Sequence, residues 1–438
     1  MTVPIEKDSR QGHRRAEMRK KRRPVGARDF WKSIGPGIVT GAADDDPSGI
    51  ATYSIAGAQY GTSLLWTALF TWPLMFAVQT MCARIGMVTG RGLAGALRHK
   101  FPRPLLIFAA CLLFVANTIN VGADLIGMAD AAELLTAVSS HIWVIVIGVA
   151  IGAATIRLRY ATIAGGLKWL ALVLVAYAVT AFYVGPKWSL VAHDTFIPHA
   201  PKVGGVWATL VAILGTTISP YLFFWQASQE VEEEKSMGRR RIADRVGAEL
   251  YEINTRKIDI GIGTFFSNAA MFFIILTTAL TLHAAGMTKL DTSRQVAEAL
   301  TPLAGRFASL LYTVGLLGTG LLAIPTLAGA GAYAFAEIFG WRQGIDERYS
   351  KAPGFYAVFI CSVGLGVALD FAGINPVSAL YWTAVINGLL APFLLVGILI
   401  AASDRALMHG QPSSMTGRVV VGVTTAIMFA AGIGMFVF

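Results

Sequence analysis

Three consecutive carboxylates, Asp44, Asp45 and Asp46, lie inside an apolar segment that is long enough to span a bilayer. A charged side chain at that depth costs several kcal/mol, so such residues are rarely present without a function. Pro47 and Gly49 follow and interrupt helical hydrogen bonding, which leaves backbone carbonyls that only a lined cavity or an ion can satisfy. The segment therefore predicts a cation site within the membrane.

A second apolar segment, residues 205–229, is interrupted in a similar way. It contains Gly215-Thr216-Thr217-Ile218-Ser219-Pro220-Tyr221, which places Pro220 in mid-helix just after small hydroxyl residues. Two interruptions five spans apart are typical of transporters built from inverted five-helix repeats, in which the first helix of each repeat points carbonyls at a shared midplane site. A simple proline kink in each helix is the alternative interpretation.

A polar stripe lies between these two segments. Asn117, Asn120 and Asp124 are spaced i, i+3 and i+7, so they share one face of a helix. A polar stripe in lipid must face protein or water, and we interpret it as the lining of an ion or proton path. Interhelical hydrogen bonding is the alternative. Gln226 and Asn268 are further candidates for this path, again with a structural role as the alternative.

The composition is that of a membrane protein. The chain has 438 residues, of which 55% are hydrophobic and 14% charged, whereas soluble domains carry roughly 25% charged residues. Recurrent apolar runs predict eleven transmembrane helices, at residues 33–57, 62–86, 104–126, 142–157, 163–184, 205–229, 259–284, 306–336, 354–373, 377–401 and 416–437.

These spans predict an all-α polytopic membrane protein. We expect an inverted five-helix repeat transporter fold of the amino acid-polyamine-organocation type, with one extra C-terminal helix. The expected parts are a basic cytoplasmic tail (1–32), a first repeat (33–184), a second repeat (205–401) and an eleventh helix (416–437). No soluble catalytic domain is left over.

The net charge of +10 comes mainly from an N-terminal tail and alternate loops. Because these charges form no basic amphipathic face, we expect a tail anchored on anionic lipid and no nucleic-acid partner; RNA or protein binding is the alternative. The positive-inside rule predicts a cytoplasmic N-terminus, and an odd span count then places the C-terminus outside. We expect a monomer in a plasma membrane, such as a bacterial inner membrane.

The two interrupted segments resemble those of the Nramp family of divalent metal transporters. Gly35-Pro36-Gly37, with Asp46 and Pro47 following, is similar to the family's first span, which carries an Asp-Pro-Gly-Asn signature. Gly215 through Tyr221 is similar to its Gly-Ala-Thr-Val-Met-Pro-His. Other segments also fit, so that the resemblance covers roughly residues 33–400: Ala123-Asp124-Leu125, Asn268 and Ile374-Asn375-Pro376.

The resemblance implies that Asp46 binds the metal, together with backbone or side-chain oxygens at Gly49, Thr216 and Ser219. Gly49 and Ser219 replace the family's asparagine and methionine. Loss of the sulfur ligand predicts a harder ion such as Mg²⁺ or Mn²⁺. Loss of both side chains predicts a wider site, in which the ion keeps part of its water shell. Nramp-related magnesium transporters are the nearest chemical analogy.

Three further residues beside Asp46 are expected in the same cavity. In one interpretation, Asp44 and Asp45 hold the ion through its water molecules. In the other, the helical step of 100° per residue turns at least one of them away from the site, toward a water-filled entrance. Ser48 is expected to line the cavity. We expect a bundle of spans 1, 2, 6 and 7 to rock and to expose the site alternately to the two sides.

Proton coupling is not expected. The family's third-span glutamate is Gly127 here, and its two sixth-span histidines are Tyr221 and Gln226. A proton relay needs ionisable groups that exchange partners. We therefore expect uncoupled uptake driven by the gradient of the metal ion.

The same residues are compatible with other functions. An organic cation or amino acid is an alternative substrate on this fold, since the aromatic residues from Tyr221 to Trp225 offer cation-π surface. A channel is a further alternative. A remote one is an intramembrane aspartyl protease that uses Asp46 and Asp124 as a dyad. No cofactor is expected, because the metal would be the substrate.

Overall fold

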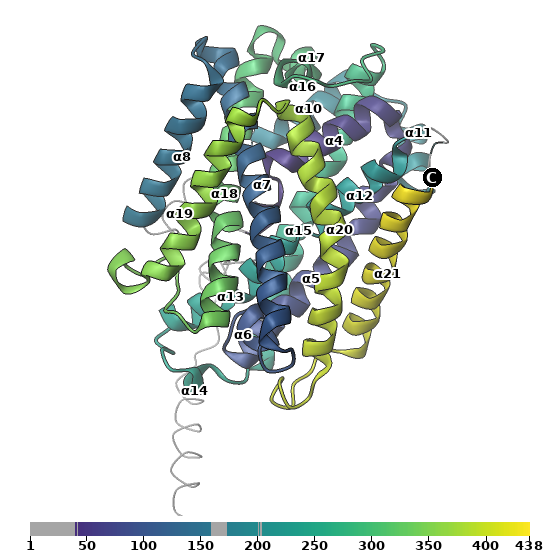
Figure 1. The fold of residues 1–438 in the computed structure, drawn as a ribbon. Coiled ribbons are helices and arrows are strands. Elements are labelled where there is room, and N and C mark those ends of the chain that lie inside the picture. The colour runs from purple at the N-terminus through teal and green to yellow at the C-terminus, as the bar shows by residue number, and fades with distance from the viewer. Residues whose placement is uncertain (1–39, 42, 159–172, 200, 202–203) are drawn as a thin grey trace, which may run out of the picture. The chain divides into compact units, whose positions relative to one another are not determined.

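The computed structural model describes residues 40–41, 43–158, 173–199, 201 and 204–438. The expected tail (1–32) and the Gly35-Pro36-Gly37 segment lie outside these residues. The part that is described consists of helices and their connections, with no strand. The helices on which the site depends are α4 (Pro47–Tyr60), α5 (Trp66–Thr89), α7 (Arg103–Thr136), α12 (Val206–Thr217), α13 (Pro220–Ser236) and α15 (Leu250–Thr278) (Figure 1).

The remaining helices surround these six or connect them. Long helices are α8 (Ser140–Arg157), α18 (Ala308–Phe339), α19 (Pro353–Leu369), α20 (Pro376–Ser403) and α21 (Met415–Val437). Short ones are α6 (Leu93–Leu97), α10 (Val175–Val184), α11 (Trp188–Phe196), α14 (Ile242–Arg245), α16 (Ser293–Ala297) and α17 (Thr301–Ala304). A π-helical turn, Ala279–His283, continues α15.

Nine helical stretches within the described residues are long and apolar enough to cross a membrane. They correspond to nine of the eleven predicted spans: 66–89, 103–136, 140–157, 206–236, 250–283, 293–339, 353–372, 376–403 and 415–437. The other two predicted spans, 33–57 and 163–184, include residues that are not described, so the total of eleven stays a prediction. Several helices extend beyond the predicted spans, because helical hydrogen bonding continues into polar turns that hydropathy does not detect.

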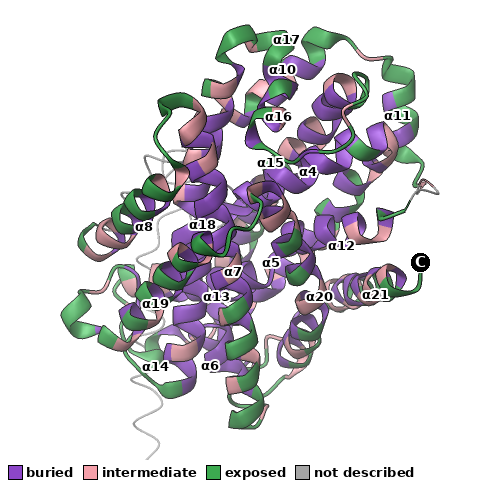
Figure 2. Cartoon of the chain, turned by 45° about the horizontal axis from the view of Figure 1, so that its top comes forward, coloured by how far each residue is buried: buried purple, intermediate pink, exposed green. Residues whose placement is uncertain are grey.

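The outer helices expose apolar side chains. Figure 2 shows exposed residues along α8 and α19, whereas α4 is buried over almost its whole length. Large exposed apolar residues include Phe108, Val115, Val149, Phe266, Phe393 and Phe436. Exposed apolar side chains of this number and size are typical of helices that face lipid.

Small residues let the inner helices approach closely. α4 contacts α7, α12, α15 and α20, and α12 packs along α20. A side chain on Gly215 would overlap the Ala384 carbonyl, and one on Gly388 would overlap the Val211 carbonyl. Close backbone contact through small residues is the usual means of helix association in membranes, and it fixes α12 against α20 here.

This packing predicts that Gly388→Ala destabilises the protein by about 1–3 kcal/mol, because the new methyl group has to displace the backbone of α12. The matched control is Gly364→Ala in α19, where an added Cβ meets no atom within 4 Å. Thermal unfolding of the purified variants in detergent measures the difference. Equal melting temperatures for the two variants would contradict the proposed close contact.

Candidate functional site

The first helix interruption is built by a capping residue. Residues 43–44 are helical, Asp45 forms a bend, and α4 begins at Pro47. Asp46 has an extended backbone (φ −69°, ψ 169°) and is the N-cap of α4. Its Oδ1 accepts hydrogen bonds from the Ser48 hydroxyl and the Gly49 amide, both at 2.7 Å. Proline suits the first position of a helix, where no N–H is required.

The second interruption separates α12 from α13. α12 ends at Thr217, α13 begins at Pro220, and Ile218 and Ser219 lie between them. The Ser219 hydroxyl lies 2.8 Å from the Gly215 carbonyl oxygen and 2.7 Å from that of Thr216, with geometry to donate to either. The Ser219 hydroxyl can therefore donate its proton to either of two carbonyl oxygens that lose their helical hydrogen bonds at the break. Each carbonyl oxygen has two lone pairs, so these groups retain capacity for another donor or for a cation.

The two interruptions lie in contact. A Cβ on Gly49 would be 3.0 Å from Oγ1 of Thr216 and 3.4 Å from Oδ1 of Asp46. The Tyr221 hydroxyl donates to the Ala43 carbonyl at 2.9 Å, which joins the start of α13 to the segment before α4. The widening predicted at Gly49 is wrong, because Thr216 and Asp46 fill the space that the missing side chain would leave.

Two members of the polar stripe on α7 reach the first interruption. The Asn120 amide donates to Oδ2 of Asp46 at 3.1 Å. Asp124 is fully buried and lies within electrostatic range of Asp46 and of the Ser48 amide. Neither Asp124 oxygen has a hydrogen-bond partner of good geometry among the described residues. Asn117, in contrast, donates to the Leu327 carbonyl of α18 at 2.9 Å and does not bond to Asp46.

Asp44 and Asp45 face α15 rather than lipid. The Ser267 hydroxyl lies 2.6 Å from Oδ2 of Asp44 and 3.2 Å from Oδ1 of Asp45. Both carboxylates are buried, and Oδ1 of Asp44 has no partner in the described part of the chain. Sequence reasoning missed Ser267, although its position directly before Asn268 in an apolar helix was a usable signal.

Asn268 connects two helices. It accepts a hydrogen bond from the Thr71 hydroxyl of α5 at 2.8 Å, and it donates to the Thr264 carbonyl at 2.9 Å. The structure therefore places Asn268 in the packing between α5 and α15, and none of its side-chain hydrogen bonds reaches Asp46.

Gln226 belongs to a buried ionic network between α13 and α15. Its amide donates to Glu230 at 2.7 Å, and Glu230 pairs with Arg256 at 2.8 Å. Arg256 also pairs with Glu233 and, at 2.6 Å, with Asp259. Sequence reasoning missed this network, because its members lie beyond the predicted ends of the apolar spans or are far apart in the chain. The carboxylates of this network have a cationic partner, unlike those around Asp46.

The carboxyl groups around Asp46 have no cationic partner among the described residues. Asp44, Asp45, Asp46 and Asp124 are at most 5% exposed, and none forms an ion pair with a described residue. The described residues also contain no group of three or more His, Cys, Asp or Glu side chains with metal-site geometry. A cation here would therefore be held by one or two carboxylates and by neutral oxygens or water, a donor set that suits hard divalent ions.

Comparison with known proteins places the chain in a family. A family model described as "Natural resistance-associated macrophage protein-like" (Nramp) matches residues 37–438. A protein of Deinococcus radiodurans named divalent metal cation transporter MntH is 25% identical over 93% of this chain and 90% of its own length. A protein of the same name from Erwinia tasmaniensis is 28% identical over 90% of this chain and 92% of its own length.

Solved structures share the fold. The crystal structure of a manganese transporter from Eremococcus coleocola superposes with a TM-score of 0.75 at 20% identity, over 94% of this chain and 88% of its own. Mhp1, a nucleobase-cation-symport-1 family transporter, gives a TM-score of 0.56 at 14% identity, over 92% of this chain and 90% of its own. The predicted all-helical, inverted-repeat transporter fold is confirmed. Because the family model covers nearly the whole chain, the protein belongs to the Nramp family.

Proposed function

We propose that this protein carries a divalent metal cation across a membrane by alternating access, with the cation bound beside Asp46. The observation that supports this most directly is the contact between the two helix interruptions, with buried Asp46 at their junction. The relatives named divalent metal cation transporters support the same substrate class. As a member of a family of metal ion transporters the chain is not an enzyme, so the aspartyl protease hypothesis is wrong.

The ligand set follows from the oxygens that have unused capacity. Three hydrogen bonds reach the Asp46 carboxylate, which offers about four lone-pair positions. The Thr216 carbonyl accepts a hydrogen bond from the Ser219 hydroxyl, and its second lone pair is available to a cation. The Thr216 hydroxyl interacts with the buried Tyr53 side chain. We assign Asp46, Thr216 and Ser219 as ligands of the cation. Gly49 leaves room for the Thr216 side chain, and the Asp124 carboxyl group lies close enough to Asp46 to interact with the cation electrostatically.

The donor set favours a hard ion. No sulfur atom is among the proposed ligands, and carboxylate, hydroxyl and carbonyl oxygens suit Mg²⁺ or Mn²⁺ better than softer ions. Asp44, Asp45, Ser48 and Tyr221 lie around the first interruption, where we propose that they form the wall of the ion path. Gln226, Asn117 and Asn268 make helix-to-helix or local bonds instead, and we assign them to the framework.

Alternating access requires a group of helices that moves together. α4, α5, α13 and α15 contact one another through the pairs α4–α15, α5–α13 and α5–α15. The Glu230–Arg256 pair and the Thr71–Asn268 bond also lie within this group. We propose that these helices form the bundle that rocks against the remaining helices around the site.

The arrangement of basic loops supports an orientation. Arg91, Arg98, Arg240, Arg241 and Arg405 lie in the connections after α5, before α14 and after α20. We propose that this end of the helices is cytoplasmic, in accordance with the positive-inside rule. With eleven spans, the C-terminus would lie outside.

Asp46→Asn tests the proposed site without removing the helix cap, since asparagine is as good an N-cap as aspartate. We expect loss of the charge to reduce Mn²⁺ and Mg²⁺ flux into liposomes at least tenfold, while the fold is retained. The control is Asp244→Asn, at an exposed position in α14. Unchanged flux in a correctly folded Asp46→Asn variant would refute the site.

Ser219→Met tests the proposed ion preference. A thioether at this position adds a soft ligand, so we expect binding to shift toward Cd²⁺ relative to Mg²⁺. Isothermal titration of the purified protein with each ion, before and after the substitution, measures the shift. Wild-type protein that already binds Cd²⁺ much more tightly than Mg²⁺ or Mn²⁺ would overturn the assignment of a hard-ion site.

We further propose that flux is not coupled to protons. Gly127 follows Asp124 by three residues on α7, and the Leu380 side chain fills the space beside it. A Cβ added to Gly127 would lie 2.8 Å from Cδ1 of Leu380. An apolar side chain therefore stands where a relay would need another ionisable group. We expect a metal gradient to drive uptake into liposomes with no change in the fluorescence of a trapped pH dye. Acidification that follows metal uptake would contradict this proposal.

The aromatic residues after the second interruption do not favour an organic cation. Phe223 and Trp225 are completely buried, and Trp225 packs edge-on against Tyr333. The Tyr221 hydroxyl is bonded to the Ala43 carbonyl. These rings are used in packing, which leaves little π surface for an ammonium group.

A further inference from the structure

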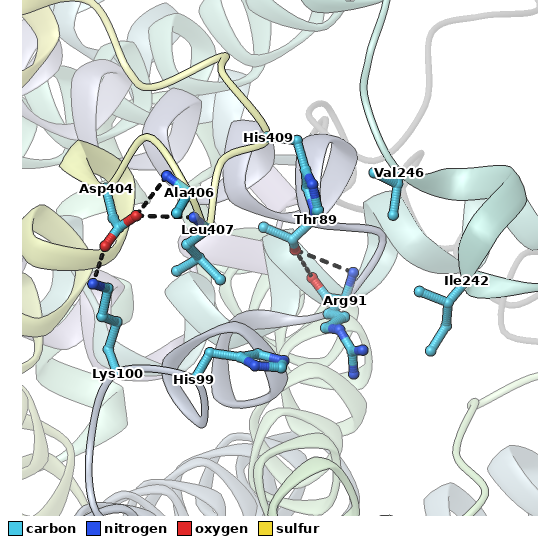
Figure 3. A pocket seen from close by; sticks show the side chains of 10 residues that line it. All are labelled: Thr89, Arg91, His99, Lys100, Ile242, Val246, Asp404, Ala406, Leu407 and His409. Atoms are coloured by element: carbon cyan, nitrogen blue, oxygen red, sulfur yellow. Dashed lines mark hydrogen bonds and ion pairs between the residues drawn. The ribbon is translucent and has the colours of Figure 1, made fainter.

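A cavity of about 370 Å³ lies at the end of the helices where α6 and α14 are found (Figure 1). Figure 3 shows the side chains that line it. This volume is within the usual range of small-ligand sites, roughly 300–1,000 Å³. Its walls come from the C-terminal end of α5, the residues that flank α6, the α14 region and the connection after α20. The lining residues are Thr89, Arg91, His99, Lys100, Ile242, Val246, Asp404, Ala406, Leu407 and His409.

The polar lining is mainly basic. Asp404 is the one carboxylate among the lining residues, and it is already paired with Lys100. The same carboxylate accepts hydrogen bonds from the backbone amides of Ala406 and Leu407, at 2.7 and 2.9 Å. These bonds fix it at one side of the cavity (Figure 3). The Arg91 guanidinium has no ion-pair partner among the described residues. Arg91 therefore supplies a positive charge that the cavity itself does not neutralise.

The surroundings add further positive charge. Burial lowers the pKa of His99 below its usual value, and Arg91, Arg98 and His409 lower it further. Every charged neighbour that affects His99 is thus basic. Arg245 lies beside the cavity, where its Nε donates to the Gly90 carbonyl at 3.2 Å. The field in the cavity therefore favours a negatively charged occupant.

The cavity also lies where the helices leave the membrane. α20 ends at Ser403, directly before Asp404, and α21 begins at Met415 shortly after His409. Both helices are long and apolar enough to span a bilayer. If α20 and α21 span a bilayer, a basic lining at these helix ends lies near the lipid headgroups, where basic pockets bind anionic lipids.

We propose that this cavity binds an anionic phosphate group, from either a lipid headgroup or a soluble phosphate compound. Arg91 provides the main charge, because a guanidinium can donate two hydrogen bonds to one phosphate. His99 and His409 contribute further donors. The Lys100–Asp404 pair holds the wall in place. This proposal does not depend on the metal site beside Asp46.

Arg91→Gln tests the proposal, with Arg348→Gln as the matched control. Arg348 is an exposed arginine in the connection after α18, and it does not line the cavity. Native mass spectrometry measures binding of short-chain phosphatidylglycerol, with phosphatidylcholine as the zwitterionic comparison. Isothermal titration measures binding of inorganic phosphate. Loss of a charge-assisted hydrogen bond predicts binding about tenfold weaker in Arg91→Gln and unchanged in Arg348→Gln.

The two probes distinguish the sources of the phosphate. Preferential binding of phosphatidylglycerol that requires Arg91, with no binding of inorganic phosphate, supports a lipid headgroup. Binding of inorganic phosphate that requires Arg91 supports a soluble compound. The proposal is overturned if wild-type protein binds neither probe, or if Arg91→Gln binds as tightly as Arg348→Gln. Equal melting temperatures establish that Arg91→Gln is folded.

Discussion

Backbone that leaves a helix inside an apolar medium has to find new hydrogen-bond partners, and the centre of this protein is organised by that requirement. At the first interruption Asp46 caps α4 through the Gly49 amide. At the second, Ser219 bonds the carbonyls of Gly215 and Thr216. The Tyr221 hydroxyl reaches from one interruption to the carbonyl of Ala43 beside the other. Each break is thus stabilised by side chains close by, and the bond from Tyr221 also holds the two breaks together.

This organisation is possible only if the helices come very close. Gly49 leaves just enough room for Thr216, and Gly215 and Gly388 let α12 lie backbone to backbone against α20. The same closeness removes water from the carboxylates of Asp44, Asp45, Asp46 and Asp124, which no described cation neutralises. Tight packing and the burial of four carboxyl groups without a described cationic partner therefore have one structural origin. A divalent cation is the natural complement to both, because it is small and doubly charged.

The sequence was informative where the signal was local. Pro47 and Pro220 begin helices at the two predicted breaks, and the spacing on α7 brings Asn120 and Asp124 to Asp46. Asn117 shares the same spacing but bonds to α18, because one face of a long helix passes more than one neighbour. Pairing over long separations was not predictable. Ser267 meets Asp44 across 223 positions in the chain, and Thr216 occupies the space that Gly49 appeared to open.

The oxygens that cap the helices are also those that a cation would need. A cation bound to the Thr216 carbonyl would repel the proton that the Ser219 hydroxyl donates to the same oxygen. One bound to Asp46 would likewise weaken the hydrogen bonds from Ser48 and Asn120 to that carboxylate. Binding would therefore change the ends of α4, α12 and α13 as well as fill the site. A ligand can drive a conformational change only through a difference in its interactions with the two states. Exchange between capping and coordination would provide such a difference, located at the ends of α4, α12 and α13.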